Sequence, residues 1–401
     1  MTQLDEVIRQ TSLALLRLRA ETSSQALAEQ LIRRYRSLDR TERITYFRFL
    51  LDHLGADRAA LDDAIAAYRA DSGEMSVTEL HAASESTRLR LFRSVNTVPH
   101  GIDALLQMRT DLIAARGDHP ELAPVEQDLI HLLRSWFNRG FLELQRLDWT
   151  TPAEVLQKLI DYEAVHEIRG WEDLRRRLAD DRRCFGFFHP SLPLEPIIFV
   201  EVALTVGMSE SIQSLIDSTA DNLHPAADTA IFYSITNCQE GLRGISFGSF
   251  LIKQVTSALT AELPSIETFA TLSPIPGFAA WLASARPKVD TTDEAAMRRS
   301  AAHYLLCERR RGLPADRVAR FHLRNGARVE RLNWRGDLSE KGLAQSHGML
   351  VNYCYSGQDL ETNHSSLVED GVVVASEVVI ADAAGDVDLM LCTESPSDVP
   401  S

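Results

Sequence analysis

The chain has 401 residues, of which 45% are hydrophobic and 25% are charged, an ordinary composition for a globular protein with a hydrophobic core. This length predicts two or three domains. With 57 acidic and 42 basic residues, the formal net charge is −15. Such a surface repels nucleic acids and anionic membranes, so we expect neither as a partner.

The sequence shows no recognisable targeting or membrane-spanning segment. No apolar run reaches the roughly 18–20 residues that a spanning helix needs. The N-terminal residues are acidic and lack the basic and apolar regions of a signal peptide, and the C-terminus is not a peroxisomal Ser-Lys-Leu. These features predict a cytoplasmic protein. The five cysteines are scattered without a Cys-x-x-Cys pair, so we expect reduced thiols and no metal site.

Residues 1–140 are predicted to form an all-α helical bundle that serves oligomerisation. Apolar residues recur at helical spacing through most of this region, which is typical of amphipathic helices. Asp39 and Glu42 have the spacing of a capping box, and Ser76 and Glu79 have it again. Residues 122–140 are predicted to form one more helix.

Residues 141–401 are predicted to form a second domain of mixed α/β type. Thr151, Pro152 and Glu154 predict a helix start with Thr151 as N-cap. Residues 171–178 predict a short helix whose arginines we interpret as a solvated face. Two apolar strands, 184–188 and 197–205, follow as an antiparallel pair. The fold class is therefore α+β.

Residues 229–278 predict a strand, helix and strand in succession. The strand at 230–234 leads through a turn that carries glycines into a helix at 245–263 and a strand at 266–272. That strand stops where Ser273 meets two prolines, which cannot donate to a ladder. Unpaired N–H groups at a helix N-terminus suit a phosphate. The glycine spacing matches neither a Walker loop nor a Rossmann fingerprint.

The C-terminal region predicts two more strands and a tail. Residues 281–293 are predicted as a loop, and 294–311 as a helix. Strands at 318–323 and 327–334 are predicted to form a hairpin through Asn325-Gly326. Residues 372–381 predict one strand, or a strand and a short helix. Residues 382–401 are acidic and predict a loosely ordered tail.

Two stretches, AIFYSITNCQEGLRGISFGSFLIKQV and FATLSPIPGF, resemble the malonyl-CoA decarboxylase family, whose catalytic domain is of the GNAT acyltransferase type. The resemblance runs from about Asp148 to about Tyr355. It implies a GNAT-like catalytic domain that converts malonyl-CoA into acetyl-CoA and CO2, within fatty acid metabolism. No cofactor is implied, because coenzyme A is part of the substrate. The family habit implies a homo-oligomer, either a dimer or a tetramer.

GLRGISFGSFLI resembles the coenzyme-A pyrophosphate loop of this superfamily. The resemblance assigns coenzyme-A binding to a run of seven residues: Arg243, Gly244, Ile245, Ser246, Phe247, Gly248 and Ser249. Some relatives carry an acidic residue at the position of Ser246, so this chain departs from them there.

The resemblance also implies a catalytic set of Ser273, His322 and Tyr355. Loss of CO2 from a malonyl thioester leaves an enolate, which needs hydrogen-bond donors at oxygen and a proton at carbon. His322 is assigned as the acid with a pKa near neutral, with His347 as a rival. Tyr355 is expected to orient the pair. Ser273 is expected to act as a base, an orienting group or an oxyanion donor.

Two other functions are compatible with the pattern. A GNAT-type acyltransferase would pass the acyl group from coenzyme A to an amine or thiol, and would need an acceptor site and a base. A non-enzymatic scaffold that responds to coenzyme A would use the helical domain as its working surface. Such a scaffold would need the pyrophosphate loop but not Ser273, His322 and Tyr355.

Overall fold

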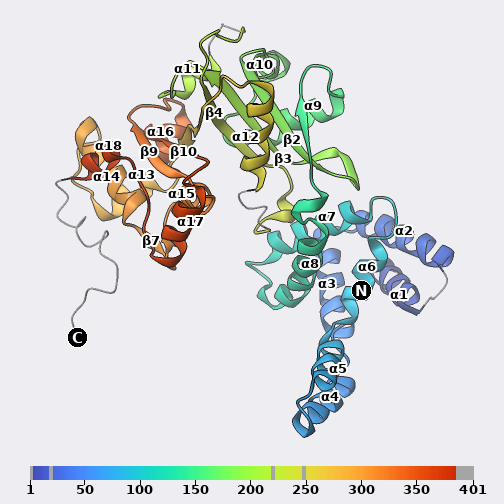
Figure 1. The fold of residues 1–401 in the computed structure, drawn as a ribbon. Coiled ribbons are helices and arrows are strands. Elements are labelled where there is room, and N and C mark those ends of the chain that lie inside the picture. Colours follow the sequence, from blue (N-terminus) through green and yellow to red (C-terminus); the bar gives the residue numbers. More distant parts are fainter. Residues whose placement is uncertain (1–2, 18–20, 218–221, 246–249, 385–401) are drawn as a thin grey trace, which may run out of the picture. The chain divides into compact units, whose positions relative to one another are not determined.

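The structure is a computed structural model that describes residues 3–17, 21–217, 222–245 and 250–384 (Figure 1). The chain divides into two compact units, each built of several segments. Unit 1 consists of Met1–Glu143, Phe188–Pro196 and Gln239–Ser246, and unit 2 of Leu144–Phe187, Ile197–Cys238 and Phe247–Ser401. A helical N-terminal region and a mixed α/β region confirm the predicted α+β class.

Unit 1 is helical, as its apolar periodicity predicts. Its elements are α1 (Gln3–Arg17), α2 (Glu21–Ser37), α3 (Arg40–His53), α4 (Arg58–Ala70), α5 (Glu74–Ser84), α6 (Thr87–Val95), α7 (Gly101–Ala115), η1 (Pro120–Leu122), α8 (Ala123–Trp136), η2 (Arg139–Phe141) and η3 (Glu240–Leu242). The capping box of Asp39 and Glu42 is confirmed at the start of α3, where each side chain accepts from the other residue's backbone N–H.

Two of the predicted helix caps are wrong. Ser76 lies inside α5, which begins after Gly73, and its buried hydroxyl donates to the Gly73 carbonyl at 2.8 Å. Thr151 is not the cap of α9 (Ala153–Tyr162), because its Oγ1 already accepts from the Asp148 N–H at 3.0 Å. In both cases a nearby backbone group uses the hydroxyl that would have capped the helix.

Eight of the described strands form one mixed sheet in the order β1-β2-β3-β4-β5-β10-β6, with β9 paired to β10. Their bounds are β1 (Glu143–Leu147), β2 (Arg182–His189), β3 (Leu192–Thr205), β4 (Thr229–Asn237), β5 (Thr268–Thr271), β6 (Ser273–Pro274), β9 (Arg328–Asn333) and β10 (Leu350–Cys354). β7 (Arg309–Arg310) and β8 (Leu313–Pro314) form a separate ribbon.

The predicted strand–helix–strand unit is confirmed. β4 and β5 are parallel, with Phe232 opposite Thr271, and α12 (Phe250–Glu262) connects them. Parallel neighbours need such a crossover. The other described neighbours of these two strands are antiparallel to them, since β3 pairs with β4 and β10 pairs with β5 in that sense. Residues 246–249, at the predicted start of the helix, lie outside the described residues.

The predicted strand at 318–323 is wrong, because this segment is the helix α15 (Arg317–Arg324). The Asp316 carboxylate caps it by accepting from the N–H groups of Val318 and Ala319. Asn325-Gly326 therefore ends a helix rather than turning a hairpin. Gly326 has a φ of 85° and its N–H donates to the Leu323 carbonyl at 3.0 Å, as a glycine just past a helix end does.

The remaining elements of unit 2 are mostly short helices. They are α10 (Trp171–Arg177), α11 (Ile212–Ile216), α13 (Phe278–Ala285), α14 (Glu294–Leu306), α16 (Glu340–Ser346), α17 (Leu360–Glu369) and α18 (Glu377–Ala383). The predicted loop at 281–293 is wrong over residues 281–285, which belong to α13, and residues 286–293 form neither helix nor strand, as predicted. Near the C-terminus, a single parallel bridge from Ala375 to Val329 precedes α18, which agrees with the strand-and-short-helix alternative.

The structure tests the prediction of no membrane-spanning helix for the described helices, and it describes little of the predicted acidic tail. None of the described helices has the length and apolarity to cross a bilayer. Most of the predicted acidic tail, residues 385–401, lies outside the described residues.

Candidate active site

The side chains of Ser273, His322 and Tyr355 form one hydrogen-bonded chain. The Ser273 Oγ lies 3.2 Å from the His322 Nε2, and the Tyr355 hydroxyl lies 2.7 Å from the His322 Nδ1. All three side chains are buried. The structure therefore brings together the three residues that the resemblance implied as a catalytic set.

Neighbouring elements hold these side chains in place. Ser273 opens β6 and lies opposite Val351 of β10. Tyr355 follows β10, and its N–H donates to the Phe269 carbonyl at 2.8 Å. His322 projects from α15, and its imidazole stacks on the Tyr353 ring with centroids 4.7 Å apart. The serine and the tyrosine come from adjacent strands, and the histidine comes from a helix beside them.

Burial indicates which group donates in each hydrogen bond between Tyr355, His322 and Ser273. It raises the pKa of Tyr355 well above 10, so this hydroxyl stays protonated. Its partner among the described residues is the His322 Nδ1, and we infer that the hydroxyl donates there. A neutral imidazole then carries its hydrogen on Nε2, which donates to the Ser273 Oγ. The Ser273 hydroxyl donates onward to the Thr271 Oγ1 at 2.9 Å. In this arrangement His322 donates to Ser273 and does not act as its base.

The expected near-neutral pKa of His322 is wrong. Desolvation of the buried ring lowers this pKa from 6.5 to about 3. Burial penalises the imidazolium because the ring bonds to two neutral hydroxyls rather than to a carboxylate. His322 is therefore neutral at physiological pH.

Asp316 connects the helix that carries His322 to the turn that follows Ser273. Besides capping α15, its carboxylate accepts from the Gly277 N–H at 3.2 Å. Gly277 has no room for a side chain, because a Cβ there would lie 2.2 Å from the Tyr304 hydroxyl. The sequence analysis missed Asp316, although an acidic residue just before a helix is a recognisable N-cap signal.

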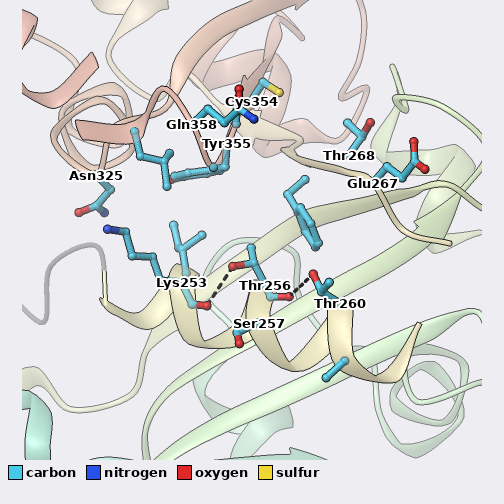
Figure 2. Close-up of a pocket in the computed structure, with 16 residues that line it drawn as sticks. Lys253, Thr256, Ser257, Thr260, Glu267, Thr268, Asn325, Cys354, Tyr355 and Gln358 are labelled. Atoms are coloured by element: carbon cyan, nitrogen blue, oxygen red, sulfur yellow. Dashed lines mark hydrogen bonds between the residues drawn. The ribbon is translucent and has the colours of Figure 1, made fainter. Parts of the chain in front are cut away.

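A cavity of about 980 Å³ lies beside this site, and Tyr355 forms part of its wall. It is lined by Ile252, Lys253, Thr256, Ser257, Thr260, Ala261, Glu267, Thr268, Phe269, Asn325, Cys354, Tyr355, Ser356, Gly357, Gln358 and Leu360. Figure 2 shows Tyr355 on one side of the cavity and the polar face of α12 on the other. A cavity of this size is suited to a ligand as large as an acyl-CoA or a substantial part of one.

The predicted coenzyme-A segment is described only in part. Arg243, Gly244 and Ile245 belong to unit 1, whereas Ser273, His322 and Tyr355 belong to unit 2. Gly244 has a φ of 78°, a conformation that favours glycine. The Arg243 side chain is exposed and pairs with Glu240 at 3.0 Å. The other predicted residues, Ser246, Phe247, Gly248 and Ser249, lie outside the described residues.

Arg109 of α7 anchors the start of this segment, which the sequence analysis missed. Its buried guanidinium donates to the carbonyls of Gly241 at 2.5 Å and Arg243 at 2.6 Å. Gly241 itself packs so closely that a Cβ would lie 2.5 Å from the Leu106 carbonyl oxygen. No sequence pattern connects an arginine in one helix with carbonyls so far along the chain.

Two family models match most of the chain. The model described as the malonyl-CoA decarboxylase C-terminal domain matches residues 140–294 and 285–390, and the one described as the N-terminal domain matches residues 54–137. The chain belongs to the malonyl-CoA decarboxylase family.

Solved structures and curated proteins of the malonyl-CoA decarboxylase family agree with this assignment. The crystal structure of the enzyme from Agrobacterium vitis is 46% identical, with a TM-score of 0.88 over 94% of this chain and 99% of that one. The structure from Rhodopseudomonas palustris is 44% identical, with a TM-score of 0.87 over 94% and 98%. The mitochondrial malonyl-CoA decarboxylase of Anser anser anser is 38% identical over 73% of this chain and 68% of its own length.

His347, the other candidate for the catalytic acid, is not part of the hydrogen-bonded series of Tyr355, His322 and Ser273. His347 ends α16 in a left-handed conformation with a φ of 51°. Within the described part of the protein, the Ser273 hydroxyl bonds to Thr271 and His322, and not to His347. The geometry therefore favours His322.

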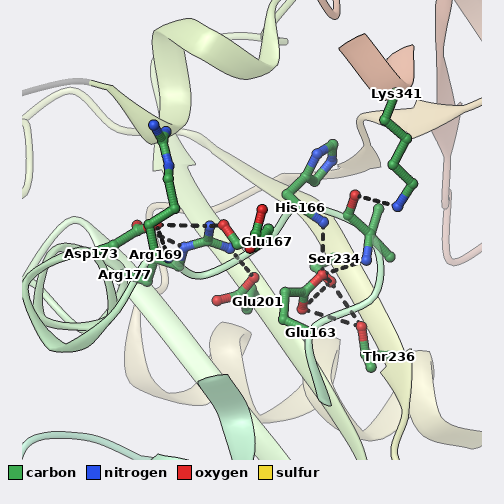
Figure 3. A network of polar contacts seen from close by, with 11 residues as sticks. Glu163, His166, Glu167, Arg169, Asp173, Arg177, Glu201, Ser234, Thr236 and Lys341 are labelled. Carbon is green, nitrogen blue, oxygen red and sulfur yellow. Dashed lines mark hydrogen bonds and ion pairs between the residues drawn. The ribbon is translucent and has the colours of Figure 1, made fainter. Parts of the chain in front are cut away.

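A second polar network occupies the interior of unit 2 (Figure 3). Arg177 is almost fully buried, donating to Glu201 at 3.0 Å and to Asp173 at 3.1 Å. This corrects the solvated-face interpretation for Arg177, whereas Arg175 is exposed as predicted. In the same figure, Glu163 accepts from the hydroxyls of Ser234 and Thr236 on β4. These paired groups hold the segments around α10 and β4 together.

Proposed function

We propose that this chain decarboxylates malonyl-CoA to acetyl-CoA and CO2 at the site formed by Ser273, His322 and Tyr355. Membership of the malonyl-CoA decarboxylase family makes it a carboxy-lyase. The observation that carries the proposed site is the buried hydrogen-bonded chain beside a large cavity. No further cofactor is proposed, because the thioester itself accepts the electron pair.

The reaction breaks the bond between the carboxylate carbon and the methylene carbon of the malonyl group. The bonding electron pair passes into the thioester and forms an enolate, while the carboxylate leaves as CO2. Ser273 turns its hydroxyl from Thr271 to the thioester oxygen, where negative charge develops. A donor placed at such an oxygen is worth about 3–4 kcal/mol of barrier.

His322 then completes the reaction by protonating the enolate carbon from Nε2. A neutral imidazole is acidic enough, because an enolate carbon is a much stronger base than the imidazolate it would leave. Tyr355 donates to Nδ1 at 2.7 Å and supplies a replacement proton there. After the product leaves, solvent returns a proton to Nε2 and the Nδ1 proton goes back to the Tyr355 oxygen, which restores the starting state. The inferred order of hydrogen-bond donation, from Tyr355 to His322 and from His322 to Ser273, supports these roles.

The acyltransferase alternative fits the geometry less well. Acyl transfer requires a base to take a proton from the acceptor amine or thiol. The buried His322, whose pKa is lowered to about 3, is a weak base. The same group remains suitable as a neutral proton donor.

The test is to incubate the purified protein with malonyl-CoA while following acetyl-CoA and CO2 together. We expect the two products in equal amounts. Ser273→Ala and His322→Gln should each lower kcat by about 10²–10⁴-fold while the chain stays folded. His347→Gln is the matched control and should retain activity. If wild type binds coenzyme A but releases no CO2, the decarboxylase assignment is wrong and acyl acceptors should be screened.

A further inference from the structure

One wall of the cavity beside Tyr355 carries an amide nitrogen that has no hydrogen-bond partner among the described residues. The Asn325 side chain is 7% exposed, and its Nδ2 has no acceptor within the described residues. Buried polar groups in folded proteins are almost always paired, so an exception calls for an explanation. Asn325 lines the cavity, and Figure 2 shows its amide end close to the end of the Lys253 side chain.

The surrounding backbone keeps this amide where it is. The Asn325 N–H donates to the His322 carbonyl at 3.0 Å at the end of α15. The next residue, Gly326, packs so tightly that a Cβ there would lie 2.2 Å from the Leu360 carbonyl oxygen. The Asn363 amide also donates to the Gly326 carbonyl at 3.0 Å. Asn325 is thus a preorganised residue on a fixed backbone, and its amide nitrogen has no partner within the part of the chain that the structure describes.

The opposite wall of the cavity carries a cationic side chain, Lys253. Figure 2 shows the Lys253 side chain extending from α12 toward Asn325. Lys253 is the only cation among the described lining residues, and Glu267 is the only carboxylate. An anionic ligand of a chain with a net charge of −15 needs a local positive group of this kind. An ammonium and an amide that converge in one cavity form a binding site for an anionic oxygen.

We propose that Lys253 and Asn325 bind the ribose 3′-phosphate of the coenzyme A part of the substrate. This inference rests on the proposed function, which supplies the coenzyme A thioester. The family resemblance assigns the pyrophosphate to residues 243–249, which leaves the 3′-phosphate as the remaining phosphate. Lys253 is exposed, which suits the end of the ligand that stays close to solvent.

Besides its phosphates, this substrate carries one more anionic group, the malonyl carboxylate. The chemistry of the reaction argues against binding of that carboxylate by Lys253 and Asn325. An ammonium paired with that carboxylate would stabilise the ground state, and the attraction would vanish as CO2 forms. Only contacts that strengthen in the transition state accelerate a reaction. A phosphate keeps its charge throughout, so binding it costs nothing in the chemical step.

The test compares the binding of coenzyme A and 3′-dephospho-coenzyme A by isothermal titration calorimetry. Wild type should prefer coenzyme A by roughly tenfold or more, which is the scale of one charge-assisted contact. Lys253→Ala should abolish this preference by weakening coenzyme A alone. Asn325→Asp has the same shape but adds a negative charge, so it should weaken coenzyme A further and spare the dephospho form. Lys288→Ala removes an exposed lysine that does not line the cavity, and is the matched control.

Steady-state kinetics separates binding from chemistry. The Lys253 and Asn325 variants should raise KM for malonyl-CoA more than they lower kcat, with unchanged thermal stability. An equal loss for both coenzyme A forms would overturn the 3′-phosphate assignment. So would a loss for malonyl-CoA that spares coenzyme A, which would place the carboxylate at this site. Because binding is measured without turnover, a wild type that shows the preference but releases no CO2 contradicts the proposed reaction and supports this site.

Discussion

The protonation state of His322 follows from its two hydroxyl partners. Nδ1 accepts from Tyr355, and Nε2 donates to Ser273. A histidine beside a carboxylate would hold a positive charge more readily, and here the buried ring has neutral partners. The site therefore offers proton donors to a developing enolate and does not generate a serine nucleophile.

The Tyr355→Phe variant tests whether Tyr355 donates to the His322 Nδ1. The variant keeps the ring but leaves the His322 Nδ1 without a donor, so the imidazole can adopt the other tautomer. We expect kcat to fall by about 10²-fold, with little change in KM. Nitrogen-15 NMR of the imidazole reports the tautomer directly. An unchanged His322 spectrum would contradict the proposed role of Tyr355.

The buried His322 also predicts how stability depends on pH. Its pKa is about 3 in the folded protein and near 6.5 in the unfolded chain. The unfolded chain therefore binds the proton more readily, and stability is lost as the pH falls from 6.5 toward 3. The loss approaches about 1.4 kcal/mol per pH unit.

Denaturant unfolding of wild type and His322→Gln between about pH 4 and pH 7 checks this dependence. The variant should show a shallower decline in the free energy of unfolding. His166, whose pKa burial lowers to about 4, is present in both proteins and does not affect the comparison. Parallel declines would mean that His322 does not titrate as proposed.

At the scale of elements, the site depends on how α15 begins. Asp316 caps this helix and also accepts from the Gly277 N–H in the turn after β6. One carboxylate thus connects the helix of His322 with the turn that follows Ser273. Burial raises the pKa of Asp316, so removal of its partners would be costly.

Asp316→Ala is therefore expected to lower both stability and activity. Loss of the cap costs about 1–2 kcal/mol, and a displaced His322 should lower kcat by roughly 10- to 100-fold. Asp293→Ala is the matched control, because Asp293 caps α14 in the same way, and α14 carries none of the three site residues. If the two variants lose equal stability and equal kcat, Asp316 does not position the site.

At the scale of the whole molecule, each unit is assembled from distant segments. Unit 1 combines its N-terminal helices with residues 188–196 and 239–246. Arg109 holds the second of these segments through the carbonyls of Gly241 and Arg243. The predicted coenzyme-A segment thus begins on backbone that the helical unit anchors. Self-association and the predicted domain boundary stay predictions.

Arg109→Met tests this anchoring. It removes a buried cation. Among the described residues, the carbonyls of Gly241 and Arg243 then lose their side-chain donor, and Glu126 keeps only its exposed partner Arg116. We expect a loss of about 3–5 kcal/mol in the free energy of unfolding and roughly tenfold weaker binding of coenzyme A. Arg116→Met, at a side chain that is 60% exposed, should cost much less. Equal effects of the two substitutions on coenzyme A binding would contradict the anchoring role.

The sequence by itself determined the α+β class, the capping box of α3, the β4–α12–β5 unit and the family. These features depend on local periodicity, turn chemistry and uninterrupted motifs, all of which are readable along the chain. The family resemblance also implied Ser273 and His322 as site residues, and only the structure showed that they are hydrogen-bonded to each other.

Tertiary structure decided the features that depend on burial. Ala319, His322 and Leu323, the buried face of α15, have the i, i+3, i+4 spacing of a helix. Over only 8 residues such spacing does not separate a helix from a strand, and the strand prediction for this stretch was wrong. Charge states and the partners of Arg109 and Arg177 likewise follow from neighbours that are distant in sequence. Desolvation and packing depend on three-dimensional proximity, and no local pattern specifies which side chains will share an interior.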